Sequence, residues 1–461
     1  MVEILDSTLR EGEQTPYVNF TVEEKVEIAR WLDRVGVEMI EAGDPSVSPN
    51  VFEAVRRIAS LGLRAEIVAH SLATRSGIEK ARACGVQRVV VFYPTSRIHL
   101  EAKMGKGEEE ALHAIVEHVR FARSLGLKVR YTPEDASRTD FEFLVRACNS
   151  AIEAGADRIS FADTLGILRP HEMYERITAL KQRLLPCKMD LHCHNDYGLA
   201  LANALEGVRA GADCIHTTVN GMGERTGIPD LAETVLALHN LMGVQRYDIQ
   251  ALPHLSAYVE RVSGFFLAPN KPVTGLNAFS HKSGVHTNGV LKDPRTYESI
   301  DPALLGRERR IVIDKYTGKR AVAARLAEYG VEVDNESLEQ IVEEIKRVGD
   351  ERKILHDADI VEIAEQVTGK HLDIFPRDIH AIVMISVESH VYTGTVVRRL
   401  KNLKYVSSVY EITGDQDIAA YIRVPNTLEL NNFIEELRAM SGVKQTETRV
   451  VLKKHAENGF A

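Results

Sequence analysis

Two histidines stand two positions apart within residues 190–196, which read DLHCHND. Apolar residues before this stretch and Gly198 after it indicate a short strand, in which residues i and i+2 point to the same face. His192 and His194 would therefore present two imidazole rings side by side, and neutral imidazoles are good ligands for a divalent metal ion. The alternative is a pair of hydrogen-bonded core histidines, and this stretch alone does not decide between the two.

A carboxylate that can complete such a metal site lies near the start of the chain, in residues 6–14 (DSTLREGEQ). Glu11 would give a set of two histidines and one carboxylate, which leaves positions on the ion open for a substrate. An ion held in this way polarises a carbonyl group as a Lewis acid. Arg10 can stabilise the negative charge that develops on the carbonyl oxygen. An Arg–Glu pair alone is usually a surface ion pair, so the prediction depends on the combination.

Short apolar segments alternate with amphipathic stretches from residue 2 to about residue 223. The expected strands are residues 2–9, 38–43, 65–70, 88–93, 128–132, 158–163, 189–194 and 214–219. The stretch 21–35 is typical of the helices between them, with Thr21 as N-cap and Glu24 at the capping-box position. Eight such units predict a (β/α)8 TIM barrel. A doubly wound open sheet is the alternative, although no glycine-rich nucleotide-binding signature follows any strand.

Polar residues gather where these strands end, which is where a TIM barrel carries its active site. They are Asp6, Arg10, Glu11, Glu41, Asp44, His70, Arg130, Thr132, Glu134, Asp163, Thr164, His192, His194 and Asn220. Acids, bases and cations occur together at nearly every strand end. This pattern favours an active site at the rim of the barrel over polar residues that merely contact solvent there.

Beyond the barrel, which we place at residues 1–262 with a helix break at Pro253, two further regions are expected. Residues 263–375 begin with an irregular stretch rich in Gly, Pro, Asn and Ser, which predicts a functional excursion, and continue as a small helical subdomain. Residues 376–461 show the order βαββαβ of a ferredoxin-like domain, in which Asn426 caps the second helix. The sequence leaves two roles open for this domain, dimerisation and the sensing of a small ligand.

The amino-acid composition limits the classes of protein to which this chain can belong. The net charge of −9 argues against a nucleic-acid-binding protein. Five cysteines without a CxxC spacing predict a reducing, cytoplasmic environment rather than a disulfide framework. We expect neither a signal peptide nor a membrane span, because Met1 leads directly into a strand-like stretch and no apolar run approaches about 18 residues.

Three motifs carry a resemblance to a known family: DSTLREGEQTP at residues 6–16, LHCHNDYGLA at 191–200 and NGMGERTG at 220–227. They resemble the acetyl-CoA-dependent Claisen-condensing synthases, the homocitrate and isopropylmalate synthase family, from residue 2 to about residue 370. The resemblance implies a divalent metal ion (Mg²⁺ or Mn²⁺, with Zn²⁺ or Co²⁺ as alternatives) that a 2-oxo acid chelates. It implies these roles: Glu11, His192 and His194 as metal ligands, and Arg10, Gln14 and Thr164 as contacts of the oxo acid.

The segment that contains HKSGVH at residues 281–286 resembles the family segment that swaps over the partner subunit of a homodimer. By this resemblance His286 and Tyr297 are acid/base residues that act in trans, and Glu134 is a further acid/base candidate in the barrel. The implied reaction removes a methyl proton from acetyl-CoA, and the enolate attacks the keto carbon. Arg10 and the metal stabilise the alkoxide, and hydrolysis of the thioester releases CoA.

The choice of oxo acid depends on the group remote from the keto carbon. Arg130, His70 and Glu11 are similar to the branch of the family that uses 2-oxoglutarate and makes homocitrate, and arginine is well suited to bind a second carboxylate. Thr132, beside Arg130, is a further candidate for substrate binding. The alternatives are 2-isopropylmalate or citramalate synthesis and, from another class, an amino-acid sensor with a relict barrel.

Feedback inhibition by lysine is a further expectation. Some members of the family bind lysine in the active site through a fourth-strand aspartate, where this chain has Val90, although Glu41, their other contact, is retained. Residues 377–455 resemble the amino-acid-binding (RAM) domain of Lrp-type regulators, without a DNA-binding helix-turn-helix. We therefore expect lysine to bind the C-terminal domain and to inhibit allosterically.

Overall fold

The computed structural model describes residues 2–351, 355, 357–370, 372, 379–425 and 427–451. The backbone divides into two compact units. The first contains Met1–His281 and Gly289–Val312, and the second contains Lys282–Asn288 and Ile313–Ala461.

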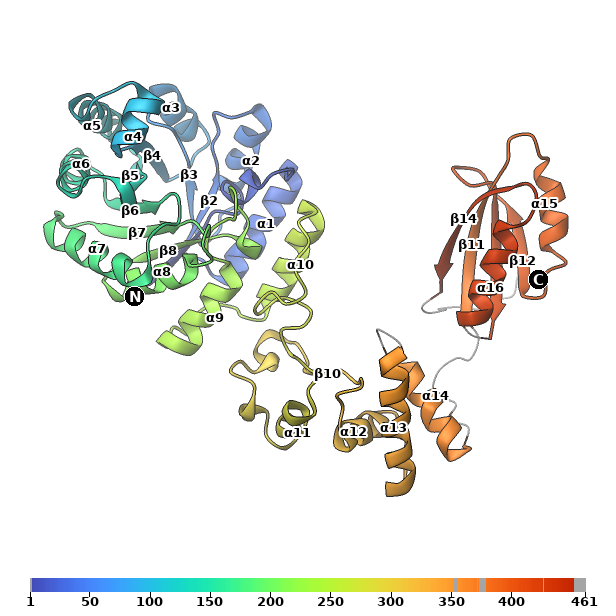
Figure 1. The fold of residues 1–461 in the computed structure, drawn as a ribbon. Coiled ribbons are helices and arrows are strands. Elements are labelled where there is room, and N and C mark those ends of the chain that lie inside the picture. Colours follow the sequence, from blue (N-terminus) through green and yellow to red (C-terminus); the bar gives the residue numbers. More distant parts are fainter. Residues whose placement is uncertain are drawn as a thin grey trace. The chain divides into compact units, whose positions relative to one another are not determined.

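Eight parallel strands of the first unit close into a barrel in sequence order (Figure 1). They are β1 (Glu3–Asp6), β2 (Met39–Gly43), β3 (Glu66–Ala69), β4 (Arg88–Pro94), β5 (Lys128–Glu134), β6 (Arg158–Asp163), β7 (Lys188–Cys193) and β8 (Cys214–Thr217). Strand β1 pairs with both β2 and β8, with Glu3 opposite Cys214, so the sheet has no edge. The TIM-barrel prediction is confirmed, and the open-sheet alternative is excluded.

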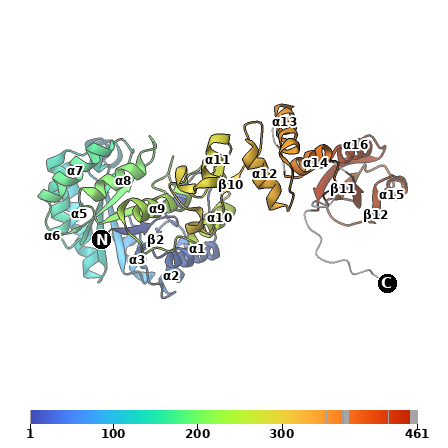
Figure 2. The same cartoon turned by 90° about the horizontal axis from the view of Figure 1, so that it is seen from below.

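Helices surround the barrel (Figures 1 and 2). They are α1 (Val22–Val35), α2 (Pro49–Ala59), α3 (Arg75–Ala83), α4 (Arg97–His99), α5 (Glu108–Ser124), α6 (Phe141–Glu153), α7 (Pro170–Arg183), α8 (Ala200–Arg209), α9 (Leu231–Met242) and α10 (Ala251–Ser263). Strand residues alternate between this shell and the barrel interior. In β6, for example, Ile159 and Phe161 belong to the hydrophobic core.

Helix α1 begins with the predicted capping box. The Thr21 side chain accepts a hydrogen bond from the Glu24 backbone N–H at 3.2 Å. The Glu24 carboxylate in turn accepts from the Thr21 N–H at 2.7 Å. These bonds satisfy two of the backbone donors that a helix start leaves without a partner. They also fix the point at which the loop after β1 enters α1.

We expect Thr21→Ala to lower the free energy of unfolding by about 1 kcal/mol, because it removes the hydroxyl acceptor of the cap. Thr21→Ser keeps that acceptor and should stay within a few tenths of a kcal/mol of the wild type. Urea unfolding followed by circular dichroism measures both values. Equal stability of the alanine and serine variants would contradict a role for the cap.

The helix break is not at Pro253. Helix α9 ends at Met242, and Gly243 adopts a left-handed conformation with φ of 71°. Pro253 instead lies in the first turn of α10. A proline is tolerated there because the backbone N–H groups of a first turn have no partner within the helix.

The barrel interior differs between its two halves. Leu5, Met39, Val68 and Val90, from β1 to β4, form an apolar cluster with Cys214. The inward residues of β5 to β8 include Arg130, Arg158, Ser160, Asp190, His192 and His216, all buried. Buried charges are tolerated only when they are paired, so this polar half must be ordered by its own ion pairs.

Ion pairs also join the strands at the amino-terminal floor of the barrel. Arg88 bonds Asp157 at 2.7 Å and Glu66 at 3.2 Å. Arg158 bonds Glu3 at 2.8 Å, and Lys188 forms a further pair with Glu3. The floor therefore links strands that are far apart in the sequence.

After the barrel, the first unit holds a two-stranded sheet of β9 (Ser280–His281) and β10 (Arg310–Ile311). Helix α11 (Gly284–Lys292) spans both units. The second unit contains α12 (Lys319–Glu328), α13 (Asn335–Glu351) and α14 (Asp357–Thr368), as the helical pattern predicted.

The C-terminal part of the second unit has the predicted βαββαβ order. Its elements are β11 (Ile379–Val387), α15 (Thr393–Leu400), β12 (Val406–Glu411), β13 (Ile418–Val424), α16 (Thr427–Arg438) and β14 (Val443–Val450). The antiparallel sheet has the order β12-β13-β11-β14, and both helices contribute to its core, for example through Val396 and Phe433. The predicted cap Asn426 and the predicted boundary at residue 376 lie outside the described residues.

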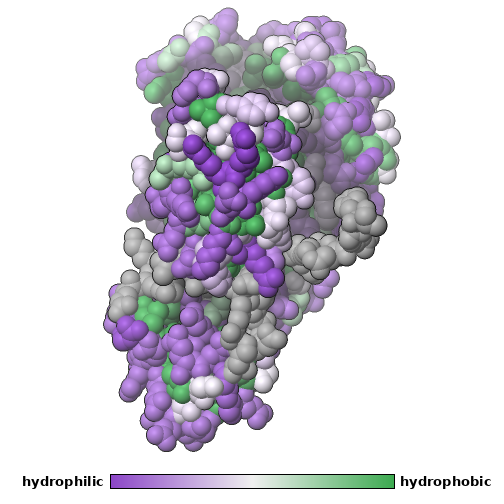
Figure 3. Space-filling model, turned by 90° about the vertical axis from the view of Figure 1, so that its right-hand side faces the viewer, coloured by the Kyte–Doolittle hydropathy of each residue, from purple (hydrophilic) through white to green (hydrophobic). Residues whose placement is uncertain are grey.

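The surface in Figure 3 is mainly hydrophilic, with apolar residues scattered between polar ones. Among the described helices, none has both the length and the apolar character needed to cross a membrane.

Candidate active site and metal centre

Glu11, His192 and His194 come together at the carboxyl-terminal mouth of the barrel. One ligand atom of each lies within 4.8 Å of the others, and all three residues are buried. Glu11 lies in the loop after β1, His192 is on β7, and His194 follows that strand. The two imidazole rings have their centres 5.2 Å apart. The alternation of β7 and the closure of the barrel thus produce the arrangement that residue spacing alone suggested.

The chemistry of this set fits a divalent cation. Burial lowers the pKa of His192 well below its usual range, and the neighbouring His194 adds to the effect. Burial also lowers the pKa of His194. Both rings are therefore neutral, which is the form that binds metal. His194 Nδ1 is buried without a hydrogen-bond partner, and the Glu11 carboxylate is oriented by the Glu224 backbone N–H at 2.9 Å.

Glu41 organises the two arginines beside the metal ligands. Its carboxylate bonds Arg10 Nε at 2.8 Å and Arg130 Nη2 at 2.5 Å. Burial alone would raise the pKa of Glu41, but Arg10 and Arg130 outweigh it and hold the pKa well below its usual range. Glu41 is therefore ionised and fixes both guanidinium groups. Arg10 also pairs with Glu11 at 2.5 Å, which places a cation directly at the candidate metal site.

Two buried donors on the inward face of β5 have no hydrogen-bond partner among the described residues. Arg130 Nε and Thr132 Oγ1 are both buried without a hydrogen-bond partner. They stand two residues apart, so they face the same side of the strand. Unsatisfied buried donors are costly, so these two can readily take up an acceptor from a bound molecule. A carboxylate matches a guanidinium beside a hydroxyl.

The other predicted substrate contacts occupy different positions around the mouth. His70 is buried, 3.5 Å from the Asp44 carboxylate, and its ring packs against Phe92 with 5.2 Å between ring centres. Thr164 is half-buried, and its hydroxyl accepts from the Asp135 N–H at 2.9 Å. Gln14 is exposed at the end of a 3₁₀ turn, Gly12–Gln14.

Glu134 meets a cation that sequence reasoning did not identify. Lys103 Nζ lies 2.9 Å from each carboxylate oxygen of Glu134, and His99 Nδ1 is 3.6 Å from Oε1. Lys103 belongs to a π-helical turn, Leu100–Met104, several residues beyond the end of β4. π-Helical turns often occur at functional sites, but no sequence pattern signals them.

His286 and Tyr297 lie in different compact units. His286 is exposed on α11 and belongs to the second unit. Tyr297 is in the first unit, 43% exposed, after a 3₁₀ turn at Pro294–Thr296. Their predicted action in trans therefore stays a prediction.

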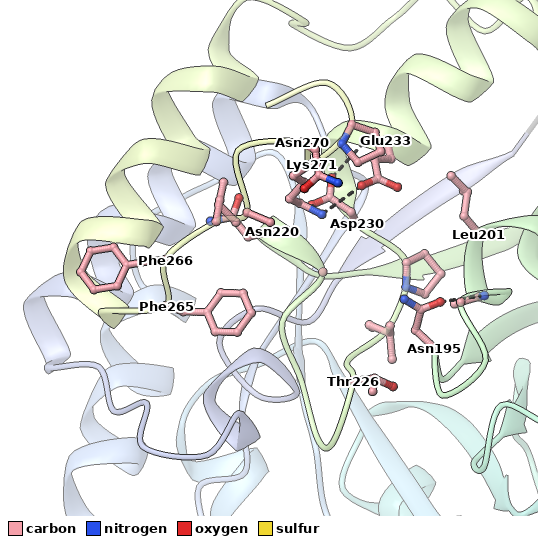
Figure 4. Close-up of a pocket in the computed structure, with 18 residues that line it drawn as sticks. Asn195, Leu201, Asn220, Thr226, Asp230, Glu233, Phe265, Phe266, Asn270 and Lys271 are labelled. Atoms are coloured by element: carbon pink, nitrogen blue, oxygen red, sulfur yellow. Dashed lines mark hydrogen bonds and ion pairs between the residues drawn. The ribbon is translucent and has the colours of Figure 1, made fainter. Parts of the chain in front are cut away.

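A cavity of about 530 Å³ lies beside the β7 and β8 loops (Figure 4). Asn195, which follows His194, lines it together with Phe265. Lys271, the only cation among its lining residues, already pairs with Asp230 at 3.2 Å and Glu233 at 2.9 Å. The cavity therefore suits an uncharged group better than a phosphate.

Three family models match the chain. The HMGL-like family matches residues 1–259, and the homocitrate synthase post-HMGL domain-like family matches residues 273–353. The Lrp/AsnC ligand binding domain matches residues 380–459.

Two relatives that match along nearly their whole length are homocitrate synthases. Homocitrate synthase from Saccharolobus solfataricus is 47% identical over 98% of this chain and 99% of its own length. Homocitrate synthase from Sulfurisphaera tokodaii is 46% identical over the same shares.

Solved structures show the same barrel fold. An HMG-CoA lyase from Bacillus subtilis has a TM-score of 0.52 at 23% identity and covers 60% of this chain and 96% of its own. An HMG-CoA lyase from Brucella melitensis has a TM-score of 0.51 at 20% identity and covers 57% and 99%.

Proposed function

Because the chain belongs to the homocitrate synthases, acyltransferases with an HMGL-like barrel, we propose that it condenses acetyl-CoA with 2-oxoglutarate to give homocitrate and CoA. One observation carries the assignment of the site: the ligand set of Glu11, His192 and His194 lies beside Arg10 at the carboxyl-terminal mouth of the barrel. The unpartnered Arg130 Nε and Thr132 Oγ1 support a second carboxylate on the oxo acid.

Glu11, His192 and His194 would hold a divalent metal ion, which as a Lewis acid would polarise the keto group of the oxo acid. Arg10 contributes a fixed positive charge where the alkoxide oxygen forms. Arg130, with His70 and Thr132, binds the remote carboxylate, and Gln14 and Thr164 contact the keto-acid end. Thiol release measured with Mg²⁺, Mn²⁺, Zn²⁺ and Co²⁺ in turn identifies the metal that the protein uses.

Proton transfer is the task of Glu134, His286 and Tyr297. A base takes a methyl proton from acetyl-CoA, and the resulting enolate carbon forms a bond to the keto carbon of 2-oxoglutarate. The alkoxide takes up a proton, and water then cleaves the thioester to leave homocitrate and CoA. Lys103 supports the role of Glu134, because its ammonium contacts both carboxylate oxygens at 2.9 Å and holds the side chain in position. We assign His286 and Tyr297 to the site of the partner subunit in a homodimer.

Release of thiol from acetyl-CoA tests this function. The assay uses Mg²⁺, Mn²⁺, Zn²⁺ or Co²⁺ and offers 2-oxoglutarate, 2-oxoisovalerate, pyruvate or 2-oxoadipate in turn. We expect the highest kcat/KM with 2-oxoglutarate and no turnover after chelation of the metal. A preference for 2-oxoisovalerate would contradict the role of Arg130, and the absence of thiol release with every oxo acid would contradict the catalytic assignment.

The C-terminal domain suggests amino-acid binding, since the Lrp/AsnC ligand binding domain matches residues 380–459. We propose that its ligand is lysine and that binding inhibits turnover. Asp415, exposed in the turn between β12 and β13, is the candidate contact. We expect Asp415→Ala to weaken inhibition by lysine at least tenfold while kcat stays unchanged.

Inhibition curves at fixed 2-oxoglutarate measure this effect, and Glu411→Gln on β12 is the matched control for a lost charge. Binding of lysine at the active site, with Glu41 as a contact, is the alternative and gives a different result. If lysine acts at the active site, it will compete with 2-oxoglutarate, and Asp415→Ala will leave the inhibition constant unchanged.

We also place the enzyme in the cytoplasm. All five cysteines lie in the described part of the chain and are unpaired. Unpaired, mostly buried thiols support a reducing compartment.

A further inference from the structure

His216, on the inward face of β8, connects a candidate metal ligand to a buried carboxylate. Its Nδ1 is 3.2 Å from His192 Nδ1, and its Nε2 is 3.4 Å from Asp190 Oδ2. All three side chains are buried. The proposed function assigns no role to His216 or Asp190.

Two neighbours compete for Nε2 of His216. Arg130 Nη1 lies 3.2 Å from it and can only donate a hydrogen bond. The Asp190 carboxylate, on the other side, can only accept one. A neutral imidazole carries a single N–H, so His216 can satisfy one of these neighbours at a time.

This choice fixes the tautomer of His192. If His216 Nε2 accepts from Arg130, its Nδ1 carries the proton and donates to His192 Nδ1. The proton of His192 is then on Nε2, the atom that faces Glu11 at 3.8 Å from Oε2. If His216 Nε2 donates to Asp190 instead, His192 Nδ1–H donates to His216. Only this second state leaves a lone pair on His192 Nε2 for a cation.

We propose that His216 and Asp190 are positioning residues that select the metal-binding tautomer of His192. This inference rests on the metal site of the proposed function. Asp190 is held in place by Arg158, whose Nε lies 2.9 and 3.1 Å from its two oxygens. A hydrogen bond to the non-ligating nitrogen is the usual means by which a protein orients a metal-binding histidine. In this protein the His216 imidazole supplies this hydrogen bond to His192, and the Asp190 carboxylate in turn contacts His216.

The choice of tautomer at His216 also changes how Arg130 can bind a substrate. In the metal-binding state, Arg130 Nη1 loses His216 as its acceptor, while its Nη2 stays on Glu41. Arg130 Nη1 is then released from His216, and the positive charge of Arg130 and its unpartnered Nε remain available to a carboxylate. Metal binding and readiness for the dianionic substrate are thus coupled through a single ring.

Asp190→Asn tests the proposal with little change in shape. With its oxygen bonded to Arg158, the new amide would turn an N–H donor toward His216 Nε2 and favour the wrong tautomer, as an amide in place of a histidine-bound carboxylate does in other enzymes. We expect the Kd for Mn²⁺, measured by calorimetry on the full-length protein without substrates, to rise about 10- to 100-fold. Asp157→Asn is the matched control, because Asp157 pairs with Arg88 on the barrel floor.

A second pair of variants tests His216 directly, in case Asp190→Asn does not fold. His216→Asn keeps, in its Oδ1, an oxygen at the position of Nδ1 that can accept from His192, so its Kd for Mn²⁺ should stay within about threefold of the wild type. His216→Leu removes the acceptor and should raise the Kd about 10- to 100-fold. A role in packing alone would give the two variants the same affinity.

Two outcomes would overturn the inference in distinguishable ways. If Asp190→Asn and His216→Leu bind Mn²⁺ like the wild type while Glu11→Gln does not, tautomer selection is wrong and the metal site stands. If Glu11→Gln also binds like the wild type, the metal site itself is wrong.

Discussion

Glu11→Gln is expected to reduce kcat for thiol release by at least about 10³-fold. The change keeps the shape of the side chain but removes the only carboxylate of the candidate ligand set. An amide neutralises less of the ion's charge, and the loss of Lewis-acid assistance removes several kcal/mol of transition-state stabilisation. Steady-state assays with saturating acetyl-CoA and 2-oxoglutarate measure the effect, and calorimetry with Mn²⁺ shows whether binding is lost in parallel.

Glu23→Gln is the control for this experiment. Glu23 is on α1, is 74% exposed and pairs only with Arg57 at the surface, and surface ion pairs contribute little to stability. We expect this variant to have wild-type kcat. If Glu11→Gln retained more than a tenth of the wild-type kcat with unchanged Mn²⁺ affinity, Glu11 would not be a ligand.

Arg130→Met is expected to lower kcat/KM for 2-oxoglutarate about 10²- to 10³-fold. The charge-assisted hydrogen bond from Arg130 Nε and the positive charge beside the remote carboxylate would be lost, which corresponds to about 3–4 kcal/mol. Oxo acids without that carboxylate lose nothing from the change. The ratio of kcat/KM for 2-oxoglutarate to that for 2-oxoisovalerate should therefore fall, and this ratio is the quantity to measure.

Arg130→Met also leaves the buried Glu41 with Arg10 as its only arginine partner. An unpaired buried charge can unfold a protein, so a loss of activity alone would not identify the cause. The double variant Arg130→Met, Glu41→Gln removes both charges and should fold. If it restored 2-oxoglutarate turnover, the effect of Arg130 would be on folding rather than on specificity.

Much of the barrel was predictable because local patterns agree with the final structure. The alternation in β7 placed His192 and His194 on one face, and the capping box at Thr21 located the start of α1. Pro253 was misread because a proline stops a helix interior but not its first turn.

The contacts that the site residues make with one another could not be predicted from the sequence. Arg130 was identified as a cation at a strand end, but its ion pair with Glu41 joins residues from β5 and β2, which only the closed barrel brings together. Lys103 reaches Glu134 through a π-helical turn that has no recognisable signature. Asp190 and His216 were overlooked as a unit because pairing between β7 and β8 depends on register, which residue spacing does not specify.

The pairing of β1 with β8 has a consequence for biosynthesis. Glu3–Asp6 leave the ribosome about 200 residues before their partners Cys214–Thr217 and the floor cation Lys188. The newly made β1, with the apolar Ile4 and Leu5, must wait for a late, long-range closure, and such contacts form slowly. Glu11 meets His192 on β7 and His194, which follows β7, only at that moment. We therefore expect a metal ion to be loaded after the whole barrel has been synthesised rather than as its first strands emerge.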